Sequence, residues 1–350
     1  MSLPAARPSA PAAPVVSVLL PVRDASATLH AALASTLASV GPSFEVVCVD
    51  DGSRDSSPAL LADFARRDPR VRVLTRPARG IAVSLCDALA AARGRFVARM
   101  DADDEMHPER LAEQVALLER RPELALAGCL VESFRAGGLR DGYRLYTEWA
   151  NGCVTHEEIA REAFVDCPVP HPTWLVRRAT LECVGGWRDL AWAEDLDLFY
   201  RLLVHGARAA KVPRVLHRWR DHDGRLTRTD SRYGRTALAR AKAHWLPRLR
   251  PMSAAVFLGS GRTARRYAKL LGAEGVATAA LVTPDEPESA RDWHGIPLVG
   301  PGALAARASE WRRSGSLLLG AAAVRGARER IRGILCGLEL VEGRDFLMLA

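Results

Sequence analysis

The chain has 350 residues and a mass of 38.0 kDa, a length that corresponds to about two domains. Hydrophobic residues make up 48% and charged residues 26% of the sequence, which excludes an intrinsically disordered protein. The formal net charge is +8, a balance found in proteins that bind nucleic acid or membrane surfaces, although the positive residues are mostly arginine and lie along the whole chain.

Residues 1–14 are rich in Pro, Ala and Ser and lack the apolar core of a secretory signal, so we expect a disordered leader. From residue 15 onward, short apolar runs alternate with segments of helical apolar spacing. The runs predict strands at 15–20, 44–49, 71–74, 96–100 and 124–130. The helical segments between them are 27–40, 57–68, 81–92 and 108–120. This alternation indicates an α/β fold with a parallel sheet that is covered on both faces.

The remainder of the chain is divided by a proline-flanked segment. Residues 136–158 are irregular, and the sequence Pro-Arg-Leu-Arg-Pro at 247–251 indicates a linker. We therefore predict a first domain at 15–247 and a smaller α/β domain at 252–350.

In the second domain, a predicted strand leads into the sequence Gly259-x-Gly261-x-x-Ala264 and a helix. These glycines suit the phosphate of a nucleotide or dinucleotide at the helix N-terminus, with Asp285 on a ribose hydroxyl. Alternatively, the glycines only allow the strand and the helix to pack closely.

No apolar run approaches the ~20 residues of a membrane-spanning helix. The cysteines are odd in number, seven, and form no Cys-x-x-Cys pair, which favours buried free thiols over disulfides or zinc ligands. We therefore expect a cytoplasmic protein.

The sequence Met-Asp-Ala-Asp-Asp at 100–104 directly follows a predicted strand. Ligands bind beyond the carboxyl ends of such strands, and Asp101 and Asp103, two positions apart, converge there. Clustered carboxylates need a counter-charge, which Mg²⁺ or Mn²⁺ supplies. Alternatively, the segment is a solvated turn that caps the next helix.

Two further acidic segments and one histidine are candidates for binding or catalysis. Asp50 and Asp51 follow the second strand and suit a base N–H or a ribose hydroxyl, or else Asp51 and Ser53 form local caps in a strand-to-helix turn. Glu194 and Asp195 begin a helical pattern, where the helix dipole stabilises acids and where one of them can serve as a general base. His222 suits a metal or a phosphate, or else it is a surface residue.

Taken in order, these motifs resemble the inverting glycosyltransferases of family 2, which have the GT-A fold. The resemblance runs from about residue 16 to residue 229. Its marks are Leu-Pro-Val at 20–22, Val-Asp-Asp-Gly-Ser at 49–53, Met-Asp-Ala-Asp-Asp at 100–104, Val-Gly-Gly-Trp-Arg at 184–188, Glu-Asp-x-Asp-Leu at 194–198 and Arg-x-His at 220–222. The second domain is similar to the small Rossmann-like domain that follows some of these enzymes.

The resemblance implies a metal-dependent transfer of a sugar from a nucleotide-diphosphate donor to a saccharide or lipid-linked acceptor. It implies a cytoplasmic enzyme of cell-surface polysaccharide synthesis, in peripheral contact with the inner face of the membrane and without a nucleic-acid partner. Asp195 would be the base, with Glu194 beside it. The donor nucleotide would contact Pro21, Asp50, Asp51 and Asp101, and the Mn²⁺ or Mg²⁺ would contact Asp101, Asp103 and His222.

Two other functions are compatible with an acid-bearing α/β sheet. A sugar nucleotidyltransferase would need a glycine-rich basic loop after the first strand, and Pro-Val-Arg-Asp-Ala-Ser at 21–26 is not one. A nucleotide-sensing scaffold without catalysis is disfavoured by the intact Asp101, Asp103 and Asp195. Many family members carry Asn where Asp24 stands, and also at Cys86 or Asp87, which affects details of the donor pocket.

Overall fold

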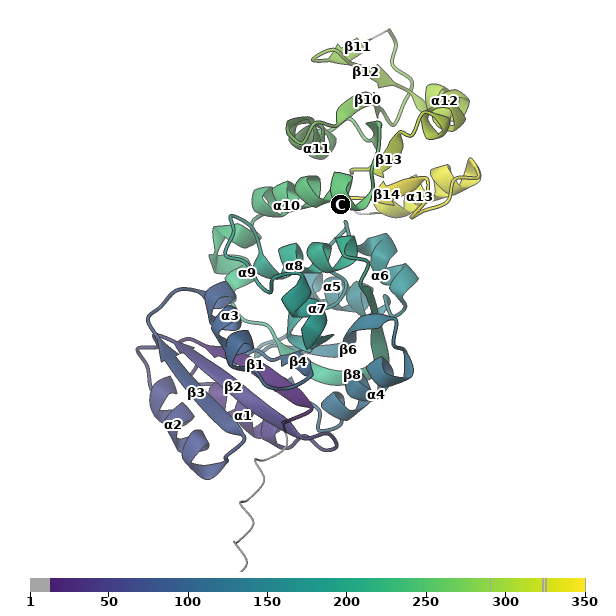
Figure 1. The fold of residues 1–350 in the computed structure, drawn as a ribbon. Coiled ribbons are helices and arrows are strands. Elements are labelled where there is room, and N and C mark those ends of the chain that lie inside the picture. Colours follow the sequence, from purple (N-terminus) through teal and green to yellow (C-terminus); the bar gives the residue numbers. More distant parts are fainter. Residues whose placement is uncertain (1–12, 290, 323, 325, 350) are drawn as a thin grey trace, which may run out of the picture.

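The computed structural model describes residues 13–349 except 290, 323 and 325, and it contains two separate sheets (Figure 1). The predicted leader therefore lies almost entirely outside the described residues. The first part begins with β1 (Val16–Val22), α1 (Leu29–Leu37), β2 (Phe44–Asp51), α2 (Ser57–Arg67), β3 (Val71–Arg76), α3 (Ile81–Ala91), β4 (Phe96–Arg99), β5 (Glu105–Met106), α4 (Arg110–Arg120) and β6 (Leu124–Phe134). It continues with α5 (Asp141–Asn151), α6 (His156–Glu162), η1 (His171–Thr173), β7 (Leu175–Arg177), α7 (Arg178–Cys183), α8 (Glu194–Val204), β8 (Arg208–Arg220), α9 (Leu226–Thr229), η2 (Ser231–Tyr233) and α10 (Arg235–Leu249).

The first sheet has eight strands in the order β3-β2-β1-β4-β7-β6-β8-β5. The pairs among β3, β2, β1 and β4 are parallel, as predicted, but β7 is antiparallel to both β4 and β6. The predicted parallel sheet is therefore confirmed for β3, β2, β1 and β4, whereas the sheet as a whole is mixed. Helices α5 and α6, a proline-rich segment and η1 lie between β6 and β7, and the chain enters β7 in the opposite direction.

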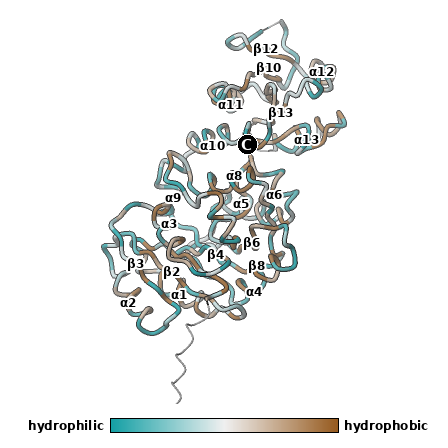
Figure 2. Tube along the Cα trace, in the orientation of Figure 1, coloured by the Kyte–Doolittle hydropathy of each residue, from teal (hydrophilic) through white to brown (hydrophobic). Residues whose placement is uncertain are grey.

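Helices cover both faces of the parallel half of this sheet. Leu19 and Val47 belong to the same core cluster as α3, whereas Val18 and Val46 pack in the cluster that contains α1 and Leu61 of α2. Successive strand residues point to opposite faces, so both faces must be apolar. This is why these strands are continuous hydrophobic runs, which are brown in Figure 2.

The structure departs from the predicted elements at two further places. Helix α5 lies within the region predicted to be irregular. Only Ala150 is fully buried, and the rest of its packed face consists of the half-buried aromatic residues Tyr143, Tyr146 and Trp149. Helix α10 extends to Leu249 and includes Pro247, so the predicted linker at 247–251 begins within a helix. A proline so close to the helix C-terminus interrupts little of it.

The second sheet has six strands in the order β11-β12-β10-β9-β13-β14, in which only the edge strand β11 is antiparallel. Its elements are β9 (Ala254–Leu258), α11 (Arg262–Ala273), β10 (Ala277–Val282), β11 (Arg291–Trp293), β12 (Ile296–Val299), α12 (Pro301–Arg313), β13 (Leu317–Gly320), α13 (Ala327–Gly337) and β14 (Phe346–Met348). The strand predicted directly before Gly259 is confirmed, as β9.

Helix α10 joins the two parts by packing rather than as a flexible connection. One core cluster includes Tyr200 of α8, Ala239 of α10 and Tyr267 of α11. The buried ammonium group of Lys242 donates to the carbonyl oxygens of Val165 (2.7 Å) and Leu349 (3.3 Å), one on each side of the junction. None of the helices in the described ranges has the length and hydropathy needed to cross a bilayer.

Candidate active site

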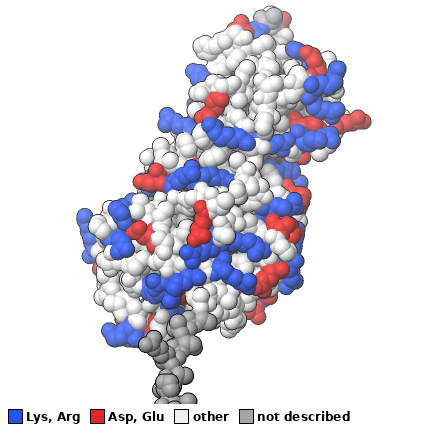
Figure 3. Space-filling model, in the orientation of Figure 1, with Lys and Arg blue, Asp and Glu red and all other residues white. Residues whose placement is uncertain are grey.

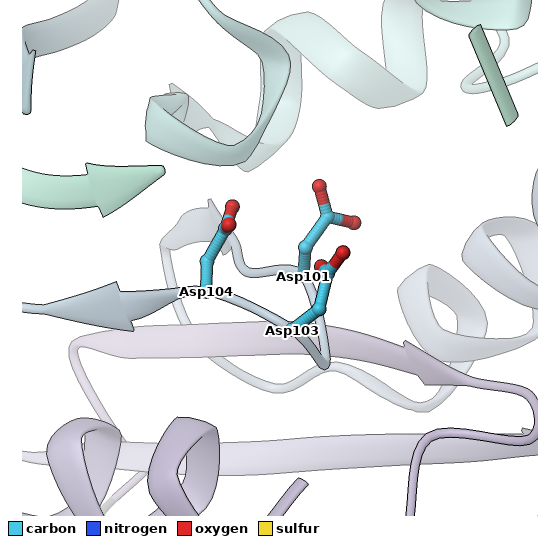
Figure 4. A group of neighbouring side chains, drawn as sticks. All are labelled: Asp101, Asp103 and Asp104. Carbon is cyan, nitrogen blue, oxygen red and sulfur yellow. The ribbon is translucent and has the colours of Figure 1, made fainter. Parts of the chain in front are cut away.

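The acidic loop that follows β4 brings three aspartates together. Asp101, Asp103 and Asp104 project to the same side of the loop (Figure 4), and carboxylate oxygens from all three lie within 4.8 Å of one another. Oxygen donors at this spacing suit a hard divalent cation. The residues present therefore fit the predicted metal.

Two of these aspartates keep an oxygen available for a ligand. Asp101 Oδ1 accepts from Arg99 Nη2 (2.6 Å), and Asp103 Oδ2 lies 2.7 Å from His222 Nε2. Among the described residues, no group donates to the other carboxylate oxygen of either side chain. The structure thus brings together Asp101, Asp103 and His222, the three residues predicted to hold the metal. Burial alone would raise the pKa of Asp103, but the His222 hydrogen bond and the charge of Arg225 outweigh burial and lower it.

Asp104 has a different role, because both of its oxygens are engaged by buried partners. Oδ1 accepts from the backbone N–H of Arg220 (2.8 Å), and Oδ2 lies 2.9 Å from His217 Nε2. Arg110 Nη1 lies 3.1 Å from His217 Nδ1. Since a guanidinium only donates, the proton of His217 is on Nε2 and is donated to Asp104. This chain of contacts fixes the acidic loop against β8 and α4.

The pKa of the Asp104 carboxyl is raised well above its usual range, first by burial and then by the charges of Asp103 and Asp101. The sequence analysis gave Asp104 no role. The available signal was a histidine five positions before His222, which the register of β8 with β5 places beside the loop.

The residues predicted to hold the nucleoside lie at the carboxyl ends of β1 and β2. Pro21 is part of β1, opposite Val49. The Asp51 carboxylate accepts the backbone N–H groups of Arg79 (2.7 Å) and Gly80 (2.9 Å), and Asp50 Oδ1 accepts that of Ser53 (3.0 Å). The Asp50 contact lies within the turn after β2, whereas the Asp51 contacts reach the loop before α3, and the nucleoside role stays a prediction.

Gly52 explains how the loop after β2 meets the loop before α3. Its φ is +72°, and a Cβ there would lie 2.9 Å from the backbone nitrogen of Ala78. Only glycine combines this conformation with such a close approach. The Asp51 contacts to the same loop therefore depend on Gly52.

Glu194 and Asp195 form the first turn of α8. Glu194 is buried, and its Oε2 accepts a 2.5 Å hydrogen bond from the hydroxyl of Tyr233 in η2. Asp195 Oδ1 accepts the backbone N–H of Leu196 (2.7 Å). Burial, and then the charge of Glu194, raises the pKa of Asp195 to about 8. Burial also raises the pKa of Glu194. The pKa of Asp195 therefore lies close to neutral pH, the range in which a general base is most effective.

A buried histidine stands behind Glu194. His171 Nε2 accepts from Trp187 Nε1 (3.0 Å), so its proton is on Nδ1, which lies 3.9 Å from Glu194 Oε1. Burial lowers the pKa of His171 well below its usual range, and the ring is neutral. The sequence analysis assigned no role to Tyr233, and it related the segment around His171 only to the shape of a pocket.

Asp197, the third acid of the same motif, is structural. It is buried, and its Oδ2 accepts from Arg201 Nε (2.8 Å), while the indoles of Trp192 (3.2 Å) and Trp245 (3.0 Å) donate to Oδ1. Arg201 also donates to the carbonyl oxygens of Val184 and Gly186. The Val-Gly-Gly-Trp segment is thereby fixed to α8.

The structure gives the glycines of the second sheet a packing role at one position. Gly259 has φ of +124°, and a Cβ there would lie 3.2 Å from the carbonyl oxygen of Ala321, as the close-packing alternative requires. Gly261 precedes α11 and has open space around its Cα. Asp285 is exposed beyond the end of β10. Nucleotide binding by Gly259, Gly261 and Asp285 stays a prediction.

Comparison with known proteins agrees with this geometry. Residues 17–185 match the model of a family described as Glycosyl transferase family 2. The O-antigen biosynthesis protein RfbC of Myxococcus xanthus is 34% identical over 193 residues, which is 54% of this chain but 14% of RfbC. The putative glycosyltransferase EpsE of Bacillus subtilis is 25% identical over 225 residues, which is 63% of this chain and 78% of EpsE.

Solved structures show the same fold. S. aureus TarS 1–349 in complex with UDP-GlcNAc superposes with a TM-score of 0.54 at 18% identity, covering 73% of this chain and 71% of that one. The first part therefore has the GT-A fold, with an Asp-x-Asp loop after β4 and an acidic pair at the start of α8. Residues 17–185 therefore form a glycosyltransferase family 2 domain.

Proposed function

We propose that this chain is a metal-dependent, inverting glycosyltransferase that moves a sugar from a nucleotide-diphosphate donor to a hydroxyl acceptor. The observation that carries the proposal is the position of Asp101 and Asp103, each with one carboxylate oxygen that is not engaged, beside the imidazole of His222. A divalent cation held there would supply the charge that stabilises the departing nucleoside diphosphate. Pro21, Asp50 and Asp51 are the proposed nucleoside contacts.

Asp195 is the proposed base. Its carboxylate takes the proton of the acceptor hydroxyl while that oxygen bonds to the anomeric carbon and the bond from this carbon to the donor phosphate oxygen breaks. Attack from the face opposite the leaving group inverts the anomeric configuration. Glu194 is the proposed positioning neighbour, held by Tyr233 and close to His171.

The relatives support a role in cell-surface polysaccharide synthesis. RfbC is named for O-antigen biosynthesis, and TarS was solved with UDP-GlcNAc. We infer a cytoplasmic enzyme with domains at 15–247 and 252–350, and an acceptor that is a saccharide or is lipid-linked.

Donor binding can be tested by thermal shift with UDP, GDP, dTDP and their common sugars, each with and without Mn²⁺. We expect one nucleotide family to raise the Tm, and to do so more strongly with metal. The proposal fails if no nucleotide stabilises the protein in either condition. With the donor so identified, Asp195→Asn should retain this shift and lose transfer.

A further inference from the structure

One face of helix α11 in the second part carries only positive charge over its first two turns. The helix buries its opposite face, which consists of Ala264, Tyr267, Ala268 and Leu271. The exposed face, which we name the α11 basic face, consists of Arg262, Arg265, Arg266 and Lys269. Figure 3 shows Lys and Arg, together with Asp and Glu, on the surface of both parts of the molecule.

The four side chains of the α11 basic face form no salt bridge within the described ranges, and the first turn of α11 contains no acid. The nearby Glu274 is engaged by Arg248 (2.8 Å) and His244 (3.2 Å) of α10. Several arginines on the surfaces of other helices are instead paired with an acid on their own helix. Examples are Arg66 with Asp63, Arg144 with Glu148, Arg178 with Glu182 and Arg307 with Glu310.

This arrangement is unfavourable for the helix by itself. The four residues are spaced three and four positions apart, so that like charges are neighbours on the helix surface and repel. Arg262 and Arg265 also lie near the N-terminus of α11, where the helix dipole disfavours cations. An anionic partner on this face would remove both penalties.

A tryptophan lies at the edge of the α11 basic face. The indole of Trp293 on β11 is half-buried, with the Arg265 guanidinium 5.5 Å and the Lys269 ammonium 5.7 Å from its ring centroid. Tryptophan beside Lys and Arg is typical of surfaces that meet the headgroup region of a bilayer, because the indole has an apolar body and a polar N–H.

We propose that the α11 basic face, with Trp293 at its edge, docks on an anionic lipid bilayer. A planar array of lipid phosphates can contact all four cations of a convex helix face at once, and each contributes to binding. The proposal rests on the charges of α11 and not on the proposed transfer chemistry. If both hold, docking would bring the enzyme to the surface where lipid-linked acceptors are found.

The test is flotation of the full chain with vesicles of phosphatidylcholine alone, or of two parts phosphatidylcholine and one part phosphatidylglycerol. We expect binding only to the anionic vesicles, and loss of binding when NaCl is raised from about 0.1 M to about 0.5 M, because salt screens the charges. Each cation contributes about fivefold to partitioning. The quadruple variant Arg262→Gln, Arg265→Gln, Arg266→Gln and Lys269→Gln should therefore bind at least about 100-fold more weakly.

A matched control removes four paired arginines with the same change in net charge. The control variant is Arg66→Gln, Arg144→Gln, Arg178→Gln and Arg307→Gln, and it should bind vesicles as the unmodified chain does. Equal loss in both variants, or no loss in the α11 variant, would overturn the proposal. So would tighter binding to a DNA duplex than to anionic vesicles, since it would assign the face to nucleic acid.

Folding and donor binding are checked on the same samples. The double variant Arg265→Gln and Lys269→Gln should lose about 25-fold in partitioning, and it keeps the test decisive if the quadruple variant unfolds. Both should retain the part of the nucleotide-dependent thermal shift that requires Mn²⁺, since the proposed metal site lies in the first part of the chain. If the chain does not bind anionic vesicles but still shows the nucleotide-dependent thermal shift, only the membrane proposal is contradicted. If it binds these vesicles but no nucleotide raises its Tm, only the transferase proposal is contradicted.

Discussion

The hydroxyl of Tyr233 donates a 2.5 Å hydrogen bond to Oε2 of Glu194, although the two residues are 39 positions apart in the sequence. Tyr233 ends a segment that begins at His222, which contacts Asp103. One short stretch of chain, 222–233, therefore contacts both the acidic loop and the proposed base pair. This stretch therefore fixes the position of the proposed metal site relative to the proposed base pair.

Replacing Tyr233 with Phe should slow transfer more than it weakens donor binding. A hydrogen bond to a charged group is worth about 1.5–3 kcal/mol, so kcat should fall about tenfold or more if Glu194 is mispositioned in the transition state. The nucleotide-dependent thermal shift should be unchanged. Steady-state kinetics with the donor found by thermal shift would measure the separation of kcat from KM.

Tyr200→Phe is the matched control for this experiment. Its hydroxyl donates to the carbonyl oxygen of Ala163 (2.9 Å) from the interior of the same α8 helix. Both variants lose one buried hydrogen bond and should have a lower Tm, but only Tyr233→Phe should reduce kcat. A similar reduction in the two would show that Tyr233 acts through general stability alone.

The rate of transfer should rise with pH through the region of pH 8. Burial and the neighbouring Glu194 raise the pKa of Asp195 to about 8, so at pH 7 only about a tenth of it is ionised and able to accept a proton. In Glu194→Gln the second cause is removed, so the pKa of Asp195 falls and the rise in kcat/KM moves to lower pH. A pH profile from 5.5 to 9.5, with both proteins stable throughout, would measure this.

The opposite outcome of this pair of variants is also informative. If Glu194→Gln abolishes transfer while Asp195→Asn retains it, Glu194 is the base. A profile without any rise near pH 8 would contradict the assignment of the base to this acidic pair.

Asp103→Asn should abolish the additional stabilisation that Mn²⁺ gives to the nucleotide complex. Asp103 contributes a carboxylate oxygen that is not engaged by another residue of the described chain, and asparagine offers only a neutral oxygen. Asp223→Asn is the control, because it removes the same charge next to His222 from an exposed side chain paired with Arg135 and Arg140. Thermal shift of the nucleotide complex in EDTA or in Mn²⁺ would measure the effect of the metal on the Tm of both variants. An increase in Tm with Mn²⁺ that survives in Asp103→Asn contradicts the metal site.

The sequence was sufficient for the elements with strong apolar patterns and for the acids that follow them. Strands buried on both faces, such as β1 and β2, are nearly continuous apolar runs, and Asp51 at the end of β2 and Asp101 after β4 lie where they were expected. Helix α5 was missed because its packed face consists of half-buried aromatic residues rather than an aliphatic stripe. The antiparallel β7 was missed because three residues carry no information on direction.

The contacts behind the site could not be predicted, because they depend on tertiary packing between distant elements. His217 reaches Asp104 across 113 positions, and Trp187 reaches His171 only because both pack in the core. No local pattern marks Tyr233 as a partner of Glu194. The residues expected to touch ligand are therefore visible in the sequence as motifs, whereas those that position them are not.

Asp197→Ala should destabilise the protein far more than the loss of an exposed ion pair with the same spacing. Asp197 and Arg201 are a buried pair at positions i and i+4, and removing the aspartate leaves the guanidinium without its counter-charge and the indoles of Trp192 and Trp245 without their acceptor. Breaking a buried pair on one side costs about 3–5 kcal/mol. Glu182→Ala breaks the exposed i,i+4 pair with Arg178 and should cost less than about 1 kcal/mol. Urea denaturation would measure both free energies of unfolding, and equal losses would contradict a structural role for Asp197.

Because Trp245 belongs to α10, the Asp197 variant should also loosen the junction between the two parts, which limited proteolysis near residue 250 would detect.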